Sequence, residues 1–140
     1  MQQSVYKSIA ESLGSRVPEC GGVLGAGEDG VICEYYFDET GVSKPDAYIP
    51  DVVAINRVLE AWHERGIHMV GIVHSHREGL RVPSCGDISY GMRILQALDT
   101  VDEFYLPILT RDGDDVRLDG YVVAKQDDRV KVMGVQIILN

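Results

Sequence analysis

Apolar side chains recur at helical spacing in three segments of the chain. The first segment is a short helix that Ser4 caps and Gly14 ends. The second covers residues 51–65 and ends before Gly66, and the third begins at Ser84. The apolar residues on these faces are Val5, Ile9 and Leu13, then Ile55, Leu59 and Trp62, then Ile88, Met92, Leu95 and Leu98. We therefore expect about three amphipathic helices.

Other segments have the patterns of strands. Residues 21–26 and 31–37 flank Glu28-Asp29-Gly30, which predicts a hairpin. Residues 69–73 are continuously apolar, as in a strand that is covered on both faces. Residues 38–50 contain Gly41 and two prolines without clear periodicity, so we expect a loop there. Further strands are expected over residues 104–110, 116–124 and 130–139.

Composition narrows the class of protein. A chain of 140 residues fits one domain, so we expect a single α/β domain over residues 1–140, with a mixed central sheet. The net charge of −9 repels phosphate backbones, which argues against a nucleic-acid partner. No apolar run is long enough to cross a bilayer, and no basic region with an apolar core suggests a secretory signal, so we expect no membrane partner. Three widely spaced cysteines favour a reducing, cytoplasmic setting.

The most informative polar pattern is His74-Ser75-His76 followed by Asp87. Residues two apart project from the same face of a strand, so both imidazoles face one side. A carboxylate at the start of the next helix can complete three protein ligands, the number typical of a catalytic zinc with an open fourth position. Two blander interpretations remain open. A histidine pair at a strand end also occurs without metal, and Ser84-x-x-Asp87 is also the pattern of an N-terminal capping box.

Glu19 is a candidate general base beside this site. A glutamate at a strand start is usually just exposed, but the residues that follow it, Cys20-Gly21-Gly22, let the backbone lie close to a cleft. Metal-assisted hydrolysis needs a group that takes a proton from water, and a glutamate outside the ligand set can do so. Cys85 is adjacent to the expected site, but Ser84 and Asp87 fit the pattern better. The histidines expected outside the site are His63 and His68.

Taken together, these segments resemble the JAMM zinc metallopeptidases, also called MPN-plus or JAB-domain proteins. The family pattern is a glutamate in a first strand, then His-(Ser/Thr)-His, seven residues, a serine, two residues and an aspartate. Glu19, His74, His76, Ser84 and Asp87 reproduce every element at that spacing. The order of helices and strands is also similar, so the resemblance covers nearly the whole chain.

The resemblance implies a cytidine-deaminase-like α/β/α sandwich that holds one zinc ion, Zn2+, per chain through His74, His76 and Asp87. Members of the family hydrolyse peptide or isopeptide bonds. The implied partner is therefore a ubiquitin-like or sulfur-carrier protein, or a peptide substrate. Arg77 stands where many prokaryotic members have proline, which bears on loop shape or substrate choice and not on ligation. The sequence leaves the substrate and the oligomeric state open.

Catalytic roles follow from the same resemblance. Glu19 is expected to act as the general base, and Ser84 to donate a hydrogen bond to the oxyanion. Ser75 is expected to face away from the ligands and to orient the strand. The loop of residues 77–83 connects two ligands and so borders the cleft. Within it, Gly79 and Arg81 are expected to contact an extended substrate tail.

Three other functions compete with a metallopeptidase. A zinc deaminase requires His-x-Glu and a pair of cysteines, whereas His76 occupies the glutamate position, so this function is rejected. A DNA-repair-associated relative with the same histidine pair is disfavoured by the acidic charge and by Glu19. A non-catalytic MPN-type scaffold or protein-binding module is the alternative that stays open, although such relatives usually lose ligands that this chain has kept.

Overall fold

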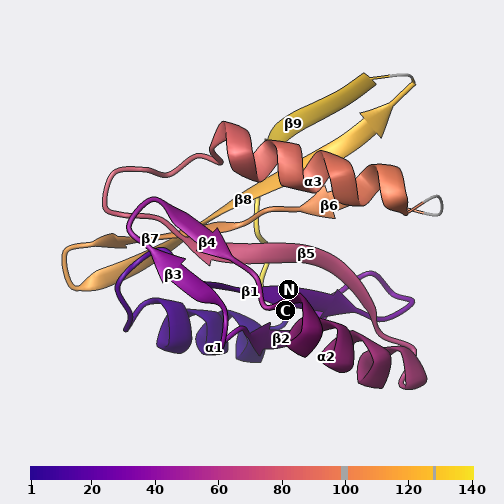
Figure 1. Ribbon diagram of the computed structural model, residues 1–140, viewed down its shortest axis with the longest axis horizontal. Coiled ribbons are helices and arrows are strands. Elements are labelled where there is room, and N and C mark those ends of the chain that lie inside the picture. The colour runs from indigo at the N-terminus through magenta and orange to yellow at the C-terminus, as the bar shows by residue number, and fades with distance from the viewer. Residues whose placement is uncertain (99–100, 128) are drawn as a thin grey trace.

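In the computed structural model, helices cover both faces of a mixed β-sheet (Figure 1). The structure describes residues 1–98, 101–127 and 129–140. The helices are α1 (Gln3–Leu13), α2 (Val52–Glu64) and α3 (Cys85–Ala97). The strands are β1 (Gly21–Ala26), β2 (Ile32–Phe37), β3 (Val42–Lys44), β4 (Ala47–Ile49), β5 (His68–Ser75), β6 (Glu103–Tyr105), β7 (Ile108–Asp112), β8 (Asp115–Gln126) and β9 (Arg129–Val135).

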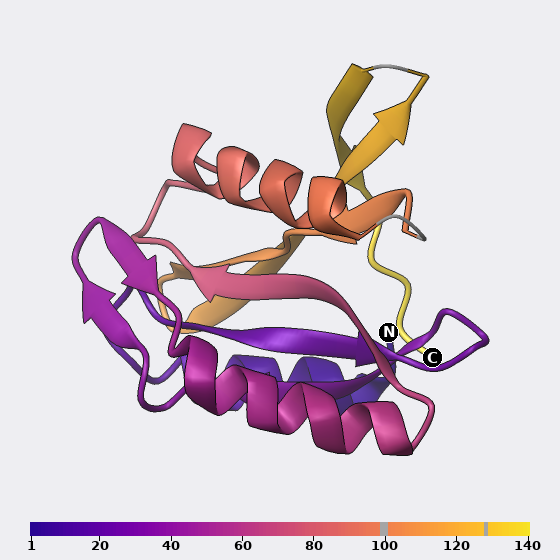
Figure 2. The same cartoon turned by 45° about the vertical axis from the view of Figure 1, so that its right-hand side comes forward.

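The main sheet is mixed, as the sequence predicts. Its strands follow the order β2-β1-β5-β6-β8-β7, and β9 adds to β8. Strand β5 runs parallel to β6 and β7, while β1 pairs antiparallel with β2 and β5. The β8–β9 hairpin extends away from the other layers in Figure 2. The expected mixed α/β sandwich is confirmed, and no helix of the described residues combines the length and the apolarity needed to cross a bilayer.

The two faces of the sheet bury alternate residues of each central strand. Val23 and Ile72 belong to the core cluster that includes residues of α2 and α3. Leu24 and Val73 belong to a second cluster with α1. Since side chains alternate along a strand, this register decides where the residues after Val73 point. His74 continues the face of Ile72, toward α2 and α3.

Most predicted elements are found where the sequence placed them, but the first helix begins differently. Helix α1 starts at Gln3, its N-cap is Gln2 and no side chain caps it, so the expected cap by Ser4 is wrong. Gly14 does end the helix, as expected. The predicted hairpin of β1 and β2 is confirmed, and Asp51 caps α2 by accepting the Ala54 N–H at 3.1 Å.

Strand β9 ends at Val135, although a strand was expected as far as residue 139, and two other segments depart further from the sequence prediction. Residues 38–50 were expected to be a loop, but they contain the antiparallel hairpin β3–β4. Its strands have three residues each and are largely exposed, which leaves no periodicity to recognise. The single strand expected over residues 104–110 is divided into β6 and β7. Pro107 lies at the break, where a residue without an N–H cannot continue a ladder of hydrogen bonds.

Candidate metal centre

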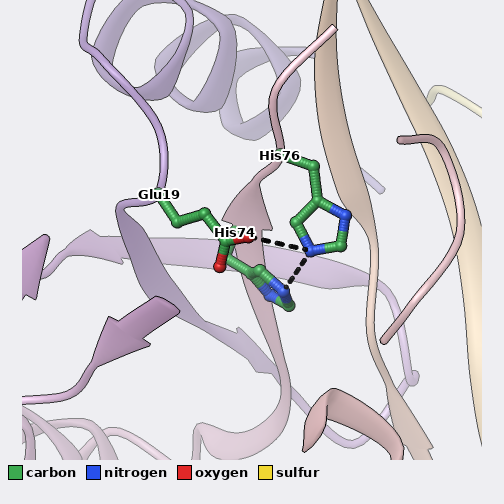
Figure 3. Close-up of side chains that lie close together, drawn as sticks. All are labelled: Glu19, His74 and His76. Atoms are coloured by element: carbon green, nitrogen blue, oxygen red, sulfur yellow. Dashed lines mark hydrogen bonds and ion pairs between the residues drawn. The ribbon is translucent and has the colours of Figure 1, made fainter. Parts of the chain in front are cut away.

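The end of β5 brings the two histidines of the His-x-His pattern together. His74 pairs with Gly21 of β1, and the His76 N–H donates to the Leu109 carbonyl at 2.9 Å. Both imidazoles are almost fully buried, with relative exposures of 4% and 5%. Their Nε2 atoms lie 3.0 Å apart (Figure 3). The sheet therefore fixes two nitrogen donors that point at one location.

Asp87 reaches the same location from the first turn of α3. Its Oδ1 lies 3.0 Å from Nε2 of His74, and its Oδ2 lies 3.2 Å from Nε2 of His76. Its Oδ2 also accepts the Ser84 N–H at 2.7 Å, while the Asp87 N–H donates to Ser84 Oγ at 3.1 Å. The capping box is therefore real, and it orients the carboxylate toward the histidines. The capping box and the proposed ligation by Asp87 are therefore compatible interpretations of Ser84-x-x-Asp87.

Glu19 approaches the histidine pair from the segment before β1, and its carboxylate points at them in Figure 3. Its Oε1 lies 3.8 Å from Nε2 of His76, farther than Oδ2 of Asp87 at 3.2 Å. Strand β3 holds its backbone, because the Glu19 N–H donates to the Lys44 carbonyl at 2.9 Å and Ser43 Oγ donates to the Glu19 carbonyl. The hairpin that the sequence did not predict thus positions the candidate base.

Ser75 faces away from the two histidines, as expected. Its Oγ accepts the Cys20 N–H at 3.1 Å and donates to the Cys20 carbonyl at 3.3 Å. The Ser75 N–H donates to that same carbonyl at 2.9 Å. These bonds tie the end of β5 to the residue after Glu19. The candidate base and the histidines are therefore held by one local network.

The donor atoms fit a zinc ion. A tetrahedral site with ligand distances of 2.0–2.1 Å separates its donors by roughly 3.3 Å. The Nε2 atoms of His74 and His76 and the oxygens of Asp87 are 3.0–3.2 Å apart, close to that spacing. A second combination joins both histidines with Glu19, whose donor atoms lie within 4.8 Å of one another. The distance from Glu19 to His76, 3.8 Å, is longer than those from Asp87 to the two histidines, so Asp87 fits the spacing of a third ligand better than Glu19 does.

Charge at the site is organised around the Asp87 carboxylate. Burial acts to raise its pKa, but hydrogen bonds with His74 and His76 lower that pKa far below its ordinary value. Burial acts to lower the pKa of His76, but the Asp87 hydrogen bond and the charge of Glu19 raise it overall. Burial also raises the pKa of Glu19, against the opposing effect of both imidazoles. A buried site with two carboxylates is suited to a cation.

A cleft of about 250 Å³ opens onto these residues. Glu19, His74, Ser84 and Asp87 all line it. Aromatic and aliphatic side chains form much of the remaining wall, namely Tyr48, Tyr90, Ile72 and Leu106. Gly21 leaves room for this wall, because a Cβ there would lie 2.8 Å from Cε1 of Tyr48. A ligand that enters this cleft therefore comes to lie beside Glu19, His74 and Asp87.

The other residues singled out in the sequence lie around the site and not in it. Arg81 is bound to Asp119 through Nε and Nη2, both at 3.1 Å. Gly79 has a φ of +86° within the loop, and its expected contact with substrate stays a prediction, as does that of Arg81. Cys85 is exposed at the start of α3. His63 and His68 were expected to lie outside the site. Their ring centroids are 5.8 Å apart.

Two aromatic residues of the cleft were missed in the sequence. Tyr90 follows Asp87 by three positions on α3, so the helical period alone places it on the same side. Tyr48 comes from the unpredicted hairpin, and its hydroxyl donates to Asp38 Oδ2 at 2.6 Å. No local pattern indicates that bond, because Asp38 and Tyr48 meet only once β3 and β4 are formed.

Comparisons with known proteins identify the fold and the family of this chain. The chain resembles the solution structure of protein DSY2949 from Desulfitobacterium hafniense, with a TM-score of 0.71 and 18% sequence identity, covering 99% of this chain and 90% of the other. At that identity the likeness establishes the fold alone. No curated protein matches the sequence significantly. The family model of prokaryotic homologs of the JAB domain matches residues 2–116. The chain therefore belongs to the prokaryotic JAB-domain family.

Proposed function

We propose that this protein is a zinc-dependent hydrolase of peptide or isopeptide bonds. The observation that carries the proposal is the convergence of His74, His76 and Asp87 within 3.2 Å, with Glu19 3.8 Å from His76. Three ligands leave one coordination position free, which is the arrangement of catalytic zinc. A structural zinc site uses four protein ligands, usually with several cysteines. The donor set and the adjacent carboxylate therefore favour catalysis.

Each side chain then has a separate task. A bound zinc would acidify a water molecule and polarise the carbonyl of the scissile bond. The Glu19 carboxylate takes the proton from the attacking water and passes it to the nitrogen that leaves when the C–N bond breaks. Because its pKa is raised, this carboxylate gains a proton more readily than the carboxylate of an exposed glutamate. This suits a group that must both accept and return a proton.

Ser84 is the candidate donor to the oxyanion. Its Oγ accepts the Asp87 N–H, so the hydroxyl hydrogen stays available for another acceptor. The residue lines the same cleft as Glu19 and His74. A hydrogen bond to the carbonyl oxygen as it gains negative charge contributes about 3 kcal/mol to catalysis in comparable sites.

We further propose that the substrate is the extended C-terminal tail of a ubiquitin-like or sulfur-carrier protein. A cleft of about 250 Å³ with aromatic walls offers limited space, which suits residues with small side chains such as glycine. Ala47 and Tyr48 of β4 line it, and within the described residues β4 pairs with β3 alone. An extended tail can add to such a free edge through main-chain hydrogen bonds. A flexible tail reaches this position more easily than a folded segment does.

Hydrolysis of a Gly-Gly tail tests the proposal. A ubiquitin-like protein joined through its C-terminal Gly-Gly to a fluorogenic amine serves as substrate. We expect the zinc-loaded wild type to release the amine, and Glu19→Gln to retain zinc but lose turnover by several orders of magnitude. Glu28→Gln is the matched control, because Glu28 is exposed in the β1–β2 turn. Equal turnover by the wild type and Glu19→Gln would refute the role of Glu19.

The same assay separates the enzyme from its alternative. A non-catalytic MPN-type scaffold would bind zinc through the same three residues, yet it would release no amine from this or from a short peptide substrate. Binding of the ubiquitin-like protein without turnover would favour the scaffold. Turnover that a chelator abolishes and added zinc restores would favour the hydrolase.

A further inference from the structure

The connection between His76 and Asp87, residues 77–83, begins with a tight turn. The Leu80 N–H donates to the Arg77 carbonyl at 3.1 Å, which closes four residues. Gly79 is the third of these, and its φ of +86° is the value that a type II turn requires at that position. Glycine adopts this conformation without strain, whereas any other residue there is strained. The turn fixes the direction of the Leu80 backbone.

The Leu80 carbonyl, in turn, contacts the ring of a predicted metal ligand. Its oxygen lies 3.0 Å from Nδ1 of His76. A carbonyl oxygen can only accept, so this contact is a hydrogen bond only when Nδ1 carries the hydrogen. In a neutral imidazole, Nε2 then has a free lone pair, and this is the atom that faces His74 and Asp87. The Leu80 carbonyl thus favours the tautomer that can bind a metal, whereas Asp87 Oδ2, 3.2 Å from Nε2, favours a hydrogen on Nε2 when no metal is bound.

The next residue of the loop is fastened to β8. Nε and Nη2 of Arg81 donate to the two oxygens of Asp119, both at 3.1 Å. The Tyr121 hydroxyl donates to the Arg81 carbonyl at 2.7 Å. Asp119 and Tyr121 are two positions apart in one strand, so both side chains project from the same face of the sheet. Three hydrogen bonds therefore hold the residue directly after Leu80, one at its backbone carbonyl and two at its side chain.

Strand register explains why β8 can reach this loop. His74 lies opposite Ile108 of β7, and Ile108 lies opposite Asp119 of β8. Residues in one row across a sheet project from the same face, so Asp119 and His74 share a face two strands apart. Figure 1 shows the connection from β5 to α3 and the β7–β8 turn extending to the same end of the molecule.

We propose that Asp119 and Tyr121 are positioning residues for the metal centre. By holding Arg81 they keep the Leu80 carbonyl on Nδ1 of His76, and so keep Nε2 ready to bind zinc. This inference rests on the proposed zinc site. Both residues lie beyond the part of the chain that matches the family model, residues 2–116. Strand β8 therefore supports a metal site whose proposed ligands all lie within the matched residues.

Zinc affinity of the full-length protein tests the inference. Asp119→Asn and Tyr121→Phe each remove hydrogen bonds to the loop without changing a metal ligand. Loss of a partner that orients a ligating histidine typically weakens metal binding 10–100-fold. We expect the zinc Kd, measured by competition with a chelator, to rise by that factor in the double variant. A double variant that binds zinc as tightly as the wild type would overturn the inference.

Two further measurements exclude a simple loss of folding. Arg117→Gln is the matched control, because Nε of Arg117 donates to Asp119 at 3.2 Å and the residue has no bond to the loop. We expect it to bind zinc like the wild type, and thermal unfolding checks that all variants fold. If Arg117→Gln weakens zinc binding as much as the double variant does, the effect comes from the ion pair between Arg117 and Asp119 and not from the hold on the loop. That result would contradict the inference.

The hydrogen bond between His76 and Leu80 supplies a test that does not depend on zinc. In the zinc-free protein, at a pH where the His76 imidazole is protonated, both ring nitrogens carry a hydrogen, and the Leu80 carbonyl should protect the Nδ1 hydrogen from exchange with water. In Asp119→Asn/Tyr121→Phe we expect NMR to show faster exchange of that hydrogen. An unchanged exchange rate would contradict the inference. If the wild type binds no zinc, the proposed function fails, and this measurement still decides whether the loop is held through β8.

Discussion

Ser84 and Asp87 hydrogen-bond to each other in both directions, at 2.7 Å from the Ser84 N–H to Oδ2 and at 3.1 Å from the Asp87 N–H to Oγ. The same Asp87 oxygens lie 3.0 and 3.2 Å from the two histidine Nε2 atoms. One pair of residues therefore begins a helix and completes a candidate metal site. Stability and chemistry are coupled at this point, and suitable variants can separate them.

Ser84→Ala should damage both functions of Ser84. Loss of the N-cap should reduce the free energy of unfolding by about 1 kcal/mol. Loss of the oxyanion donor should lower kcat by about 10²–10³-fold while zinc stays bound. Ser84→Thr is the control, because threonine keeps a hydroxyl at the same position. If Ser84→Ala loses stability but keeps full kcat, Ser84 is a cap and not an oxyanion donor.

Asp87→Asn should separate the cap from the metal. The amide oxygen of asparagine still accepts the Ser84 N–H, so the cap is kept, but the charge that hydrogen-bonds with His74 and His76 is lost, so we expect a moderate fall in zinc-free stability. The charge that attracts the cation is lost, so zinc affinity should fall markedly. Chemical unfolding and zinc competition measure the two effects separately. Unchanged zinc affinity would remove Asp87 from the ligand set.

Tyr48 should make stability sensitive to alkaline pH. Burial and its hydrogen bond to Asp38 raise the pKa of Tyr48 well above the ordinary value of about 10. Above pH ~10 the unfolded chain loses this proton and the folded chain keeps it, so stability falls as pH rises. Compared with Tyr48→Phe, the wild type should lose about 1.4 kcal/mol more per pH unit there. Parallel stability curves for the two proteins would contradict this.

Gly21 tests how tightly the wall of the cleft is packed. A Cβ at this position would lie 2.8 Å from both Tyr48 Cε1 and the Val73 carbonyl oxygen. We expect Gly21→Ala to cost about 1–3 kcal/mol in urea unfolding, because a backbone atom cannot move aside. Gly134→Ala is the control, since nothing lies within 4 Å of its Cβ position. If Gly21→Ala reduces stability no more than Gly134→Ala does, the wall of the cleft can make room for the added methyl group, and the prediction is wrong.

Local patterns predicted the centre of the molecule well. The apolar run before His74 is found as the buried part of β5, and alternation along it places both imidazoles on the face that α3 covers. The capping pattern of Ser84 and Asp87 predicts both the start of α3 and the direction of its first carboxylate. These features depend on residues that are close in the sequence.

The features that were missed depend on tertiary contacts. Strand β4 carries Tyr48 to the cleft, but its three residues have too little periodicity to be recognised. The tie between Arg81 and Asp119 joins residues 38 positions apart, and it exists only because β7 brings β8 to the end of β5. Such pairs depend on the order of the strands in the sheet, which no single segment of the sequence predicts.

Zinc content measures the central claim most directly. Purified wild-type protein and a His74→Ala/His76→Ala variant, both exposed to the same zinc and then desalted, should be compared by metal analysis. We predict one zinc ion per wild-type chain, because the Nε2 atoms 3.0 Å apart and the Asp87 carboxylate form one ligand set. The variant should bind none. Equal zinc in the two proteins would contradict the assignment of the metal centre.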